Sequence, residues 1–477
     1  MAYRKGNRSQ ATLLPASIED YVSVADPVRA YDALIDTIDL ESLGINLFEH
    51  KIGNSSYDPQ AMLKILVYSY SYGWRSSRKI ERALHHNLSF IWLSGDLKPD
   101  HKTISEFRRN NKKPLKLLLK QVAHICMELG LIEGNSLFLD GSKIRGNCSI
   151  NATRSKEWCD KQLSKLDVRI DEILTQCDSE DSSQSDNLVS VKKELQDTKK
   201  LKAKVKDIKS RIDELGVEKI NTTDEEAINF KSRQGSHAGY NAQVVTDEKH
   251  GLIVSADVVN ESNDFNQFSS QIDRANEALG KNCKTATADA GYASIDDLKQ
   301  THDKGIKVIV PSQKQALHKK SESEFDKDKF SYDKKNNCYT CPANNLLLYY
   351  RHDNKGRSIY KSKAANCLSC EHFSKCTTNK RGRTIARLKN EDLKNHLETQ
   401  YLKDENQEIY KLRKSKVELQ FGHIKRNLGA GYFLLRGLEK VKAEMGILAS
   451  CFNIARMINL TGGVEQMVIK LNSLKPV

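Results

Sequence analysis

Two short stretches, each ending in an aspartate, constrain the fold of this chain most. Residues 137–139 are apolar and precede Asp140, and the small residues 285–288 precede Asp289. Short runs of this kind are typical of buried strands. A carboxylate at the end of such a strand is costly unless it is paired, hydrogen-bonded or bound to a metal. We therefore expect a sheet that carries two acids, with Gly141-Ser142 as the turn from the first strand into a second. Asp140 could also be no more than a turn-forming residue before Gly141.

Length and charge limit the class of protein. The 477 residues are enough for about three domains, and 76 Lys+Arg against 62 Asp+Glu leave a net charge of +14. This balance favours a polyanionic partner, although it could also belong to an ordinary solvated surface. The sequence contains no uncharged apolar run of about 18 residues and no signal-peptide core. We expect a soluble cytoplasmic protein with no membrane association.

Residues 1–131 predict a helical N-terminal domain. After Asp58-Pro59, apolar residues recur at helical spacing between residues 62 and 70. Thr103 and Glu106 have the spacing of a capping box, which predicts a helix start at Thr103. Short basic helices suit a DNA reader of the helix-turn-helix type, and a helical support domain fits the pattern equally well.

Residues 154–217 carry a pattern that predicts an inserted coiled-coil hairpin. Polar residues 178–186 predict its turn. The hairpin could be a simple spacer, or it could be an arm for dimerisation or DNA contact. Apolar residues recur at spacings of three and four along two segments, with a shift of phase in the second: Leu163, Leu166, Ile170, Ile173 and Cys177, then Leu188, Val191, Leu195, Leu201, Val205, Ile208, Ile212 and Leu215.

The segments on either side of this insertion, 132–153 and 218–324, predict a mixed α/β core. Residues 238–247 and 251–259 are typical of a β-hairpin, residues 266–279 of a helix, and residues 306–310 of a further strand. Alternation of strands and helices of this kind calls for a mixed sheet with helical cover.

Clustered cysteines between residues 325 and 390 predict a small zinc module. Cys338-x2-Cys341 and Cys367-x2-Cys370, followed by Cys376, have the spacing of a tetrahedral thiolate site. There are five candidates for four places. Such a closed site stabilises a fold and does no chemistry. The basic run 380–383, with Arg387, could lie on phosphates or form a solvated loop.

Residues 391–477 predict a helical end of the core that carries a third acid. Val417, Phe421 and Ile424 share one face of a helix, which places Glu418 at the margin of a buried stripe. Arg413 and Lys425 lie about one and two turns from it. Three carboxylates from separate segments can hold two Mg²⁺ ions about 3.5–4 Å apart, which activate a water or hydroxyl for displacement at phosphorus.

Motifs that match a known family extend over almost the whole chain. The third-acid region has Tyr410 and Arg413 before Glu418 and six residues between Glu418 and Lys425, and Cys341-Pro with Cys367-x2-Cys370-x5-Cys376 adds a cysteine motif. In these motifs the chain resembles the DDE transposases of bacterial insertion sequences, in particular the group numbered eleven eighty-two. The other matching residues are 57–59 (Tyr-Asp-Pro), 76–78 (Ser-Ser-Arg), 90–93 (Phe-Ile-Trp-Leu), 99–104, 107–108, 139–144 (Leu-Asp-Gly-Ser-Lys-Ile), 288–292 (Ala-Asp-Ala-Gly-Tyr) and 417–422 (Val-Glu-Leu-Gln-Phe-Gly).

The resemblance implies an α/β, RNase H-like catalytic core with the other modules attached. It implies Mg²⁺ or Mn²⁺ on three catalytic acids, a structural Zn²⁺, and double-stranded DNA, both element ends and target, as partner, with a homodimer in the active complex and a location at the nucleoid. The residues carried over are Asp140, Asp289 and Glu418 for catalysis and metal binding; Cys341, Cys367, Cys370 and Cys376 for zinc, with Cys338 as the alternative; and Arg413, Lys425, Arg426 and Arg108 for DNA.

The sequence departs from the family signature at one point and admits rival functions. Four residues, where the signature has three, separate Arg413 from Glu418. One rival is a DNA-binding repressor or architectural protein that has lost catalysis. Another is an RNase H-like nuclease or junction resolvase, which would cleave DNA without a preference for element ends.

Overall fold

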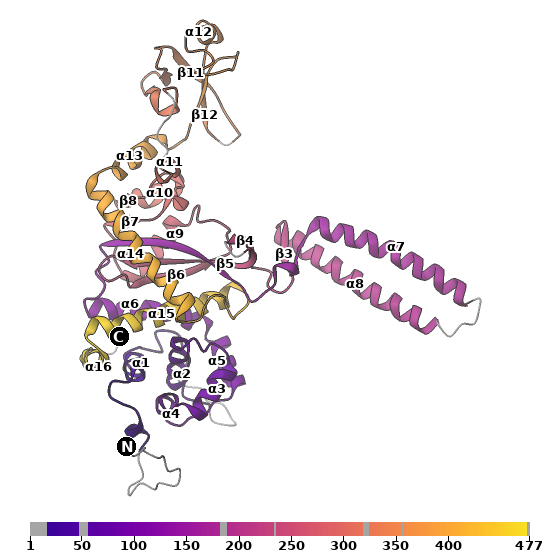
Figure 1. Cartoon of the computed structure of the whole chain (residues 1–477), viewed down its shortest axis with the longest axis vertical. Helices are drawn as coiled ribbons and strands as arrows, with labels where there is room; N and C mark the ends of the chain where they lie inside the picture. The colour runs from indigo at the N-terminus through magenta and orange to yellow at the C-terminus, as the bar shows by residue number, and fades with distance from the viewer. Residues whose placement is uncertain are drawn as a thin grey trace, which may run out of the picture.

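The computed structural model describes residues 17–46, 56–181, 188–232, 235–317, 324–354 and 356–474. A sheet forms the middle of the molecule, with the N-terminal helices at one end and the cysteine-rich module at the other (Figure 1). A long helical hairpin projects sideways from the sheet. The predicted turn of that hairpin falls mostly on residues 182–187, which lie outside the described residues.

The N-terminal part is helical. Asp58 caps α2 by accepting hydrogen bonds from the backbone N–H groups of residues 60 and 61. Helix α5 starts at His101, because Asp100 accepts the Thr103 N–H at 2.7 Å. The helix start expected at Thr103 was therefore wrong, and Thr103 belongs to the first turn. The elements are η1 (Ile18–Tyr21), α1 (Pro27–Asp36), α2 (Pro59–Ser71), α3 (Ser77–His86), α4 (Leu88–Ser94), α5 (His101–Asn110) and α6 (Lys112–Glu128).

The central sheet is mixed, in the order β4-β5-β1-β7-β8, and β6 also pairs with β5. Strand β1 is antiparallel to β5 and parallel to β7, which is parallel to β8. The turn expected at Gly141-Ser142 was wrong, because both residues continue β1 opposite Gln243 and Ala242, and Asp140 lies within the strand. The strands are β1 (Ser136–Arg145), β4 (Ile228–Ser232), β5 (Gly235–Asp247), β6 (Ile253–Val259), β7 (Thr285–Thr287) and β8 (Lys307–Ile309).

Helices from the second half of the chain cover the sheet and join it to the N-terminal helices. Helix α15 packs on α6, α2 and β6, so a continuous hydrophobic core runs from the N-terminal helices into the sheet. The elements are α9 (Phe268–Leu279), η3 (Ala290–Tyr292), α10 (Ile295–His302), α11 (Gln313–Ala316), α13 (Glu391–Tyr401), α14 (Asp404–Arg426), α15 (Leu438–Thr461) and α16 (Val464–Asn472).

A buried ion pair fastens this junction. Arg75 Nη1 lies 2.7 Å from Glu444 Oε1, and both side chains are buried. Arg75 also donates to the backbone carbonyls of Gly429 and Tyr432, and Glu444 accepts the N–H groups of Leu434 and Leu435. The pair therefore holds the chain between α14 and α15 against the N-terminal helices.

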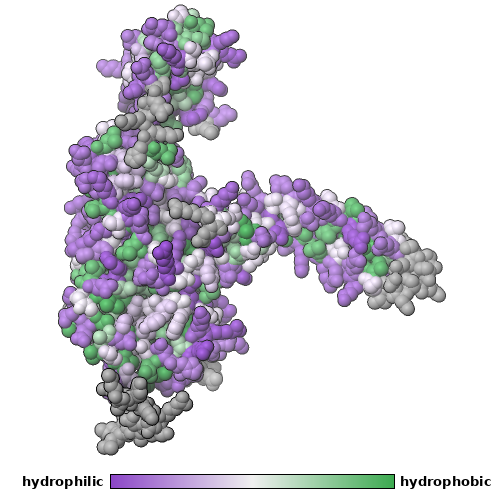
Figure 2. Space-filling model, in the orientation of Figure 1, coloured by the Kyte–Doolittle hydropathy of each residue, from purple (hydrophilic) through white to green (hydrophobic). Residues whose placement is uncertain are grey.

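Helices α7 (Lys156–Asp181) and α8 (Leu188–Leu215) form the projecting hairpin, which a small pairing of β2 (Thr153–Ser155) with β3 (Lys219–Asn221) joins to the body after η2 (Ile150–Ala152). Apolar residues of the predicted seam, such as Ile173, Val205 and Ile212, are buried. Leu201 and Leu215 are about half exposed, so the seam is shorter than predicted. Hydrophilic residues cover most of the face of the hairpin that is visible in Figure 2. Coiled-coil packing of α7 against α8 stays a prediction.

The cysteine-rich module has a sheet of its own, in the order β13-β12-β11-β10-β9 with antiparallel neighbours. Its core is separate from the main one and consists mainly of aromatic and apolar side chains: Phe330, Tyr339, Leu347, Tyr360 and Ile385. The elements are η4 (Lys327–Lys329), β9 (Ser331–Asp333), β10 (Cys338–Thr340), β11 (Leu346–His352), β12 (Ser358–Ser362), α12 (Ala364–Leu368) and β13 (Thr384–Arg387).

Within the described ranges, no single helix is both long and apolar enough to span a membrane. Only α15 and α16 taken together reach the length and apolar composition of a span, and a bend of 100° separates them.

We predict that Glu444→Ala lowers the free energy of unfolding by about 3–5 kcal/mol, because it leaves the buried Arg75 guanidinium unpaired. Urea unfolding measures this difference. The control is Glu106→Ala, which removes an exposed pair with Arg109 and should cost about 0–1 kcal/mol. Equal costs for the two variants would contradict a structural role for the buried pair.

Candidate active site

Asp140 and Asp289 meet at one edge of the sheet because of strand register. Phe138 of β1 lies opposite Thr287 of the parallel strand β7, and each aspartate follows two residues later. Asp289 begins η3, where its Oδ1 accepts the Gly291 N–H at 2.8 Å. The arrangement brings together two acids that are far apart in the sequence.

A single guanidinium connects the two acids. Arg413 Nη2 lies 2.7 Å from Asp140 Oδ1 and 3.3 Å from Asp289 Oδ2. The Arg413 side chain is 14% exposed and Asp140 19%, so little water screens the Arg413–Asp140 pair, whereas Asp289 is 43% exposed. Arg413 Nε is buried and has no hydrogen-bond partner among the described residues. This edge of the sheet therefore carries two carboxylates, and the Arg413 guanidinium is the cation that pairs with them.

The electrostatics of Asp140 reflect this crowding. The pKa of Asp140 is raised to about 6. Burial is the largest cause, Arg413 opposes the shift, and the charges of Asp289 and Asp264 contribute to it. Asp264 was not predicted from the sequence. Its Oδ1 accepts hydrogen bonds from Asn241 at 2.8 Å and Gln243 at 2.7 Å. The available signal was the presence of Asn241 and Gln243 within an otherwise apolar strand, where both are buried.

Helix α14 supplies Arg413 and lies against β1 (Figure 1). Val417, Phe421 and Ile424 are buried, as their spacing predicted. Gln420 donates to the Gly251 carbonyl at 2.6 Å, which holds the helix to the loop between β5 and β6. Lys425 Nζ lies 2.5 Å from Ser142 Oγ. The helix is thereby fixed on both sides of the two aspartates.

Glu418 lies apart from the other two acids. Its side chain is exposed on α14 and makes no hydrogen bond or ion pair with any residue that the structure describes. Within the described ranges, no group of three or more His, Cys, Asp and Glu side chains is already spaced to hold a metal ion. The structure thus brings Asp140, Asp289 and Arg413 together and leaves Glu418 outside that contact.

Arg108 and Arg387, which the sequence assigned to DNA or phosphate, are buried in the protein. Arg426, by contrast, is exposed at the end of α14. Arg108 is buried and donates to the Arg75 carbonyl at 2.9 Å and to the Tyr70 hydroxyl. The assignment of Arg108 to DNA is corrected for this reason. Arg387 stacks on the Tyr332 ring at 3.7 Å, so it belongs to the module core.

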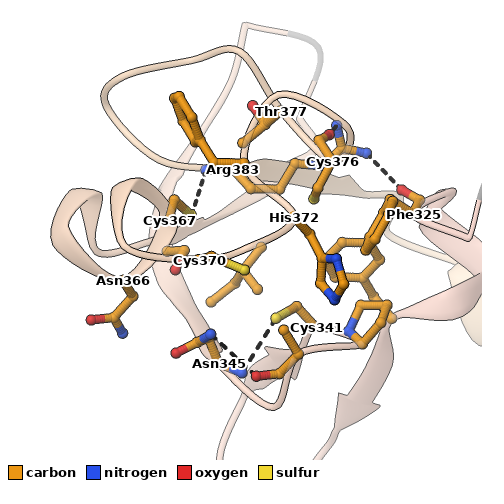
Figure 3. A pocket seen from close by; sticks show the side chains of 16 residues that line it. Phe325, Cys341, Asn345, Asn366, Cys367, Cys370, His372, Cys376, Thr377 and Arg383 are labelled. Atoms are coloured by element: carbon orange, nitrogen blue, oxygen red, sulfur yellow. Dashed lines mark hydrogen bonds between the residues drawn. The ribbon is translucent and has the colours of Figure 1, made fainter.

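Four of the clustered thiols line one small cavity (Figure 3). Its volume is about 30 Å³, the share of one water molecule in the liquid. The Asn345 N–H donates to Cys341 Sγ at 3.3 Å and the Arg383 N–H to Cys367 Sγ at 3.4 Å. Burial raises the pKa of Cys376, and the neighbouring thiols add to this effect. The cavity-lining thiols are Cys341, Cys367, Cys370 and Cys376; Cys338 is buried in β10 and does not line the cavity.

Comparison with known families gives two matches. Residues 16–110 match a model described as a transposase domain (DUF772), and residues 340–458 match one described as a transposase DDE domain. Both matches support a transposase of the DDE class. The second range includes Glu418 and the cavity-lining thiols, whereas Asp140 and Asp289 lie outside both ranges.

Among solved structures, the chain is similar to a piggyBac transposase in a synaptic complex with hairpin DNA. The two are 11% identical, the match covers 94% of this chain and 79% of that chain, and the TM-score is 0.33. No curated protein matches the chain.

The raised pKa of Asp140 predicts a pH effect on the stability of the metal-free protein. Between pH values of about 3.8 and 6, the folded protein keeps a proton on Asp140 that the unfolded chain releases, so the stability contributed by this group falls as pH rises. In urea unfolding with a chelator, wild type should therefore lose stability relative to Asp140→Asn across this window, and the difference should level off above it.

The control for this measurement is Asp303→Asn, which changes an exposed acid at the end of α10. Its difference from wild type should not vary in the same window. A flat difference for Asp140→Asn would contradict the burial of an ionisable Asp140.

Proposed function

We propose that this protein is the DNA transposase of a bacterial insertion sequence in the group numbered eleven eighty-two. It binds the ends of its element, cleaves the DNA backbone with a divalent metal and joins the freed 3′-hydroxyl to target DNA. The observation that carries the proposal is the meeting of Asp140 and Asp289 on Arg413 at one sheet edge. The two transposase domain matches support the same class.

The central sheet is proposed to be the RNase H-like core of this enzyme. Its first strand lies inside the sheet, with β5 antiparallel to it on one side and β7 parallel to it on the other. This arrangement supports the proposal because it places Asp140, which lies within β1, beside Asp289, which follows the end of β7. The α7–α8 hairpin and the cysteine-rich module are then insertions that leave the order of the sheet strands unchanged.

Mg²⁺, or Mn²⁺ in its place, suits these acids because both cations take hard oxygen ligands. Asp140 and Asp289 would hold the metal, with Glu418 as the third acid. When bound, it would activate the attacking water or hydroxyl and stabilise the leaving oxygen at phosphorus. The donor set fits, since Arg413 already pairs with both aspartates and the edge accommodates positive charge.

Glu418 shares a helix face with Lys425, because residues seven positions apart on a helix point in nearly the same direction. Lys425 reaches Ser142 in the strand that carries Asp140. A Glu418 side chain on that face is therefore turned toward β1, which supports its role as the third acid. The role requires the side chain to move in toward the two aspartates when DNA and metal bind.

The cations of α14 are proposed to hold the DNA backbone. A guanidinium such as that of Arg413 suits phosphate oxygens geometrically. Lys425 and Arg426 follow on the same helix, more than three turns beyond Arg413. These contacts would position the phosphate and carry no sequence information. Joining two element ends calls for two copies of the chain, so the active complex is proposed to be a homodimer on double-stranded DNA.

The cysteine-rich module is proposed to bind a structural Zn²⁺ through its cavity-lining thiols. The N–H groups directed at Cys341 and Cys367 Sγ favour thiolates. Cys376→Ser should lose the metal and destabilise the module, whereas Cys338→Ser should keep about one zinc per chain. Elemental analysis of the purified variants measures this. Equal loss from both variants would contradict the choice of thiols.

Catalysis is tested with Asp140→Asn on DNA that carries the element ends. Nicking with Mn²⁺ or Mg²⁺ should be abolished, because one metal ligand loses its charge, while binding of end DNA in gel shifts should persist. Asp303→Asn should nick like wild type. Full nicking by Asp140→Asn would refute the assignment.

The same assay separates the rival functions. A repressor or architectural protein would bind the ends without nicking them in any metal. A nuclease or junction resolvase would cleave branched DNA irrespective of terminal sequence. Nicking restricted to element ends would exclude both.

A further inference from the structure

A polar network lies on the face of β1 opposite to Asp140. Asp140 and Ser142 both contact α14, and side chains alternate between faces along a strand, so the intervening Gly141 faces the other way. Asp264 occupies the space on that side. A Cβ on Gly141 would lie only 2.6 Å from Asp264 Oδ1 and 2.8 Å from the Tyr292 hydroxyl.

Gly291 leaves room for the Asp289 carboxylate and borders on Asp264. A Cβ there would lie 2.9 Å from Asp289 Oδ1 and 3.7 Å from Asp264 Oδ2. Neither Gly141 nor Gly291 has a positive φ, so backbone conformation does not require glycine at these positions. The glycine at position 141 is instead explained by the approach of Asp264 and its partners, and the glycine at position 291 by the approach of Asp289 Oδ1.

The network extends from Asp264 to the turn that carries Asp289. A carboxylate only accepts hydrogen bonds, so the Gln243 amide must present its NH₂ group to Asp264, at 2.7 Å. The Gln243 carbonyl then faces the Tyr292 hydroxyl, which donates to it. Tyr292 is the last residue of η3, the turn that begins at Asp289. Asp264 therefore orients Gln243, and Gln243 holds the Asp289 turn.

We propose that Asp264 is a positioning residue of the cation site, which fixes the Asp289 turn through Gln243 and Tyr292 and adds its charge beneath Asp140 and Asp289. The inference rests on the proposed function, because it concerns the metal of that site. Asp264 touches neither substrate nor reacting atoms in this account. It raises the affinity of Asp140 and Asp289 for a divalent cation.

The test is Mn²⁺ binding by the full-length protein, measured by titration calorimetry without DNA. The part of the Mn²⁺ binding heat that is absent in Asp140→Asn is assigned to this site. Asp264→Asn should weaken this binding about tenfold, as is usual for groups that support metal ligands. Tyr292→Phe keeps the charge and removes only the hydroxyl, so it should weaken binding by a smaller factor. The double variant should lose less than the product of the two factors, because both act through Gln243.

The outcomes separate this inference from the proposed function. If wild type shows no Mn²⁺ binding that Asp140→Asn removes, the metal site itself fails. If wild type binds and Asp264→Asn binds equally well, the inference is overturned, and a lower melting temperature with unchanged affinity would mean that Asp264 is merely structural. Should Asp264→Asn fail to fold, unchanged affinity in Tyr292→Phe overturns the inference. Asp303→Asn serves as the charge control and should bind like wild type.

Discussion

Repulsion between two carboxylates at one sheet edge is the constraint on which the site depends. The register of β1 and β7 places Asp140 and Asp289 side by side, and burial makes the Asp140 charge costly. Like charges in a poorly hydrated place need a cation. Arg413 supplies it from α14, so the helix that carries the remaining candidate residues has to lie along this edge.

The position of α14 depends in turn on contacts far from the acids. Gln420 fixes the helix to the loop between β5 and β6. The chain that follows α14 is held by Arg75 and Glu444, which are buried between the N-terminal helices and α15. The first and last parts of the chain thus share one core with the sheet. The hairpin and the cysteine-rich module have apolar clusters of their own, so they can be inserted without repacking the sheet.

Local patterns located much of this correctly, and two of the errors share a cause. The buried face of α14 and the strands around Asp140 and Asp289 follow from spacing alone, because periodicity reports which side is apolar. Gly141 was open to interpretation as a turn residue, and Arg108 as a DNA contact. Both depend on neighbours distant in sequence: Asp264 beside Gly141, and Tyr70 with the Arg75 carbonyl around Arg108. The helix start expected at Thr103 was wrong for a different reason, because Asp100, three residues earlier, caps the helix.

The sequence by itself determined most of the elements, the association of both aspartates with buried strands, and the cysteine-rich segment, because these are properties of composition and spacing. Only the tertiary structure decided that Arg413 joins Asp140 to Asp289, that Cys338 stands apart from the thiols of the cavity, and that Asp264 lies beneath the acids. Each of these depends on which side chains meet across strands and helices. Charge and hydrogen bonding act over a few ångströms in space, and distance along the chain does not report that separation.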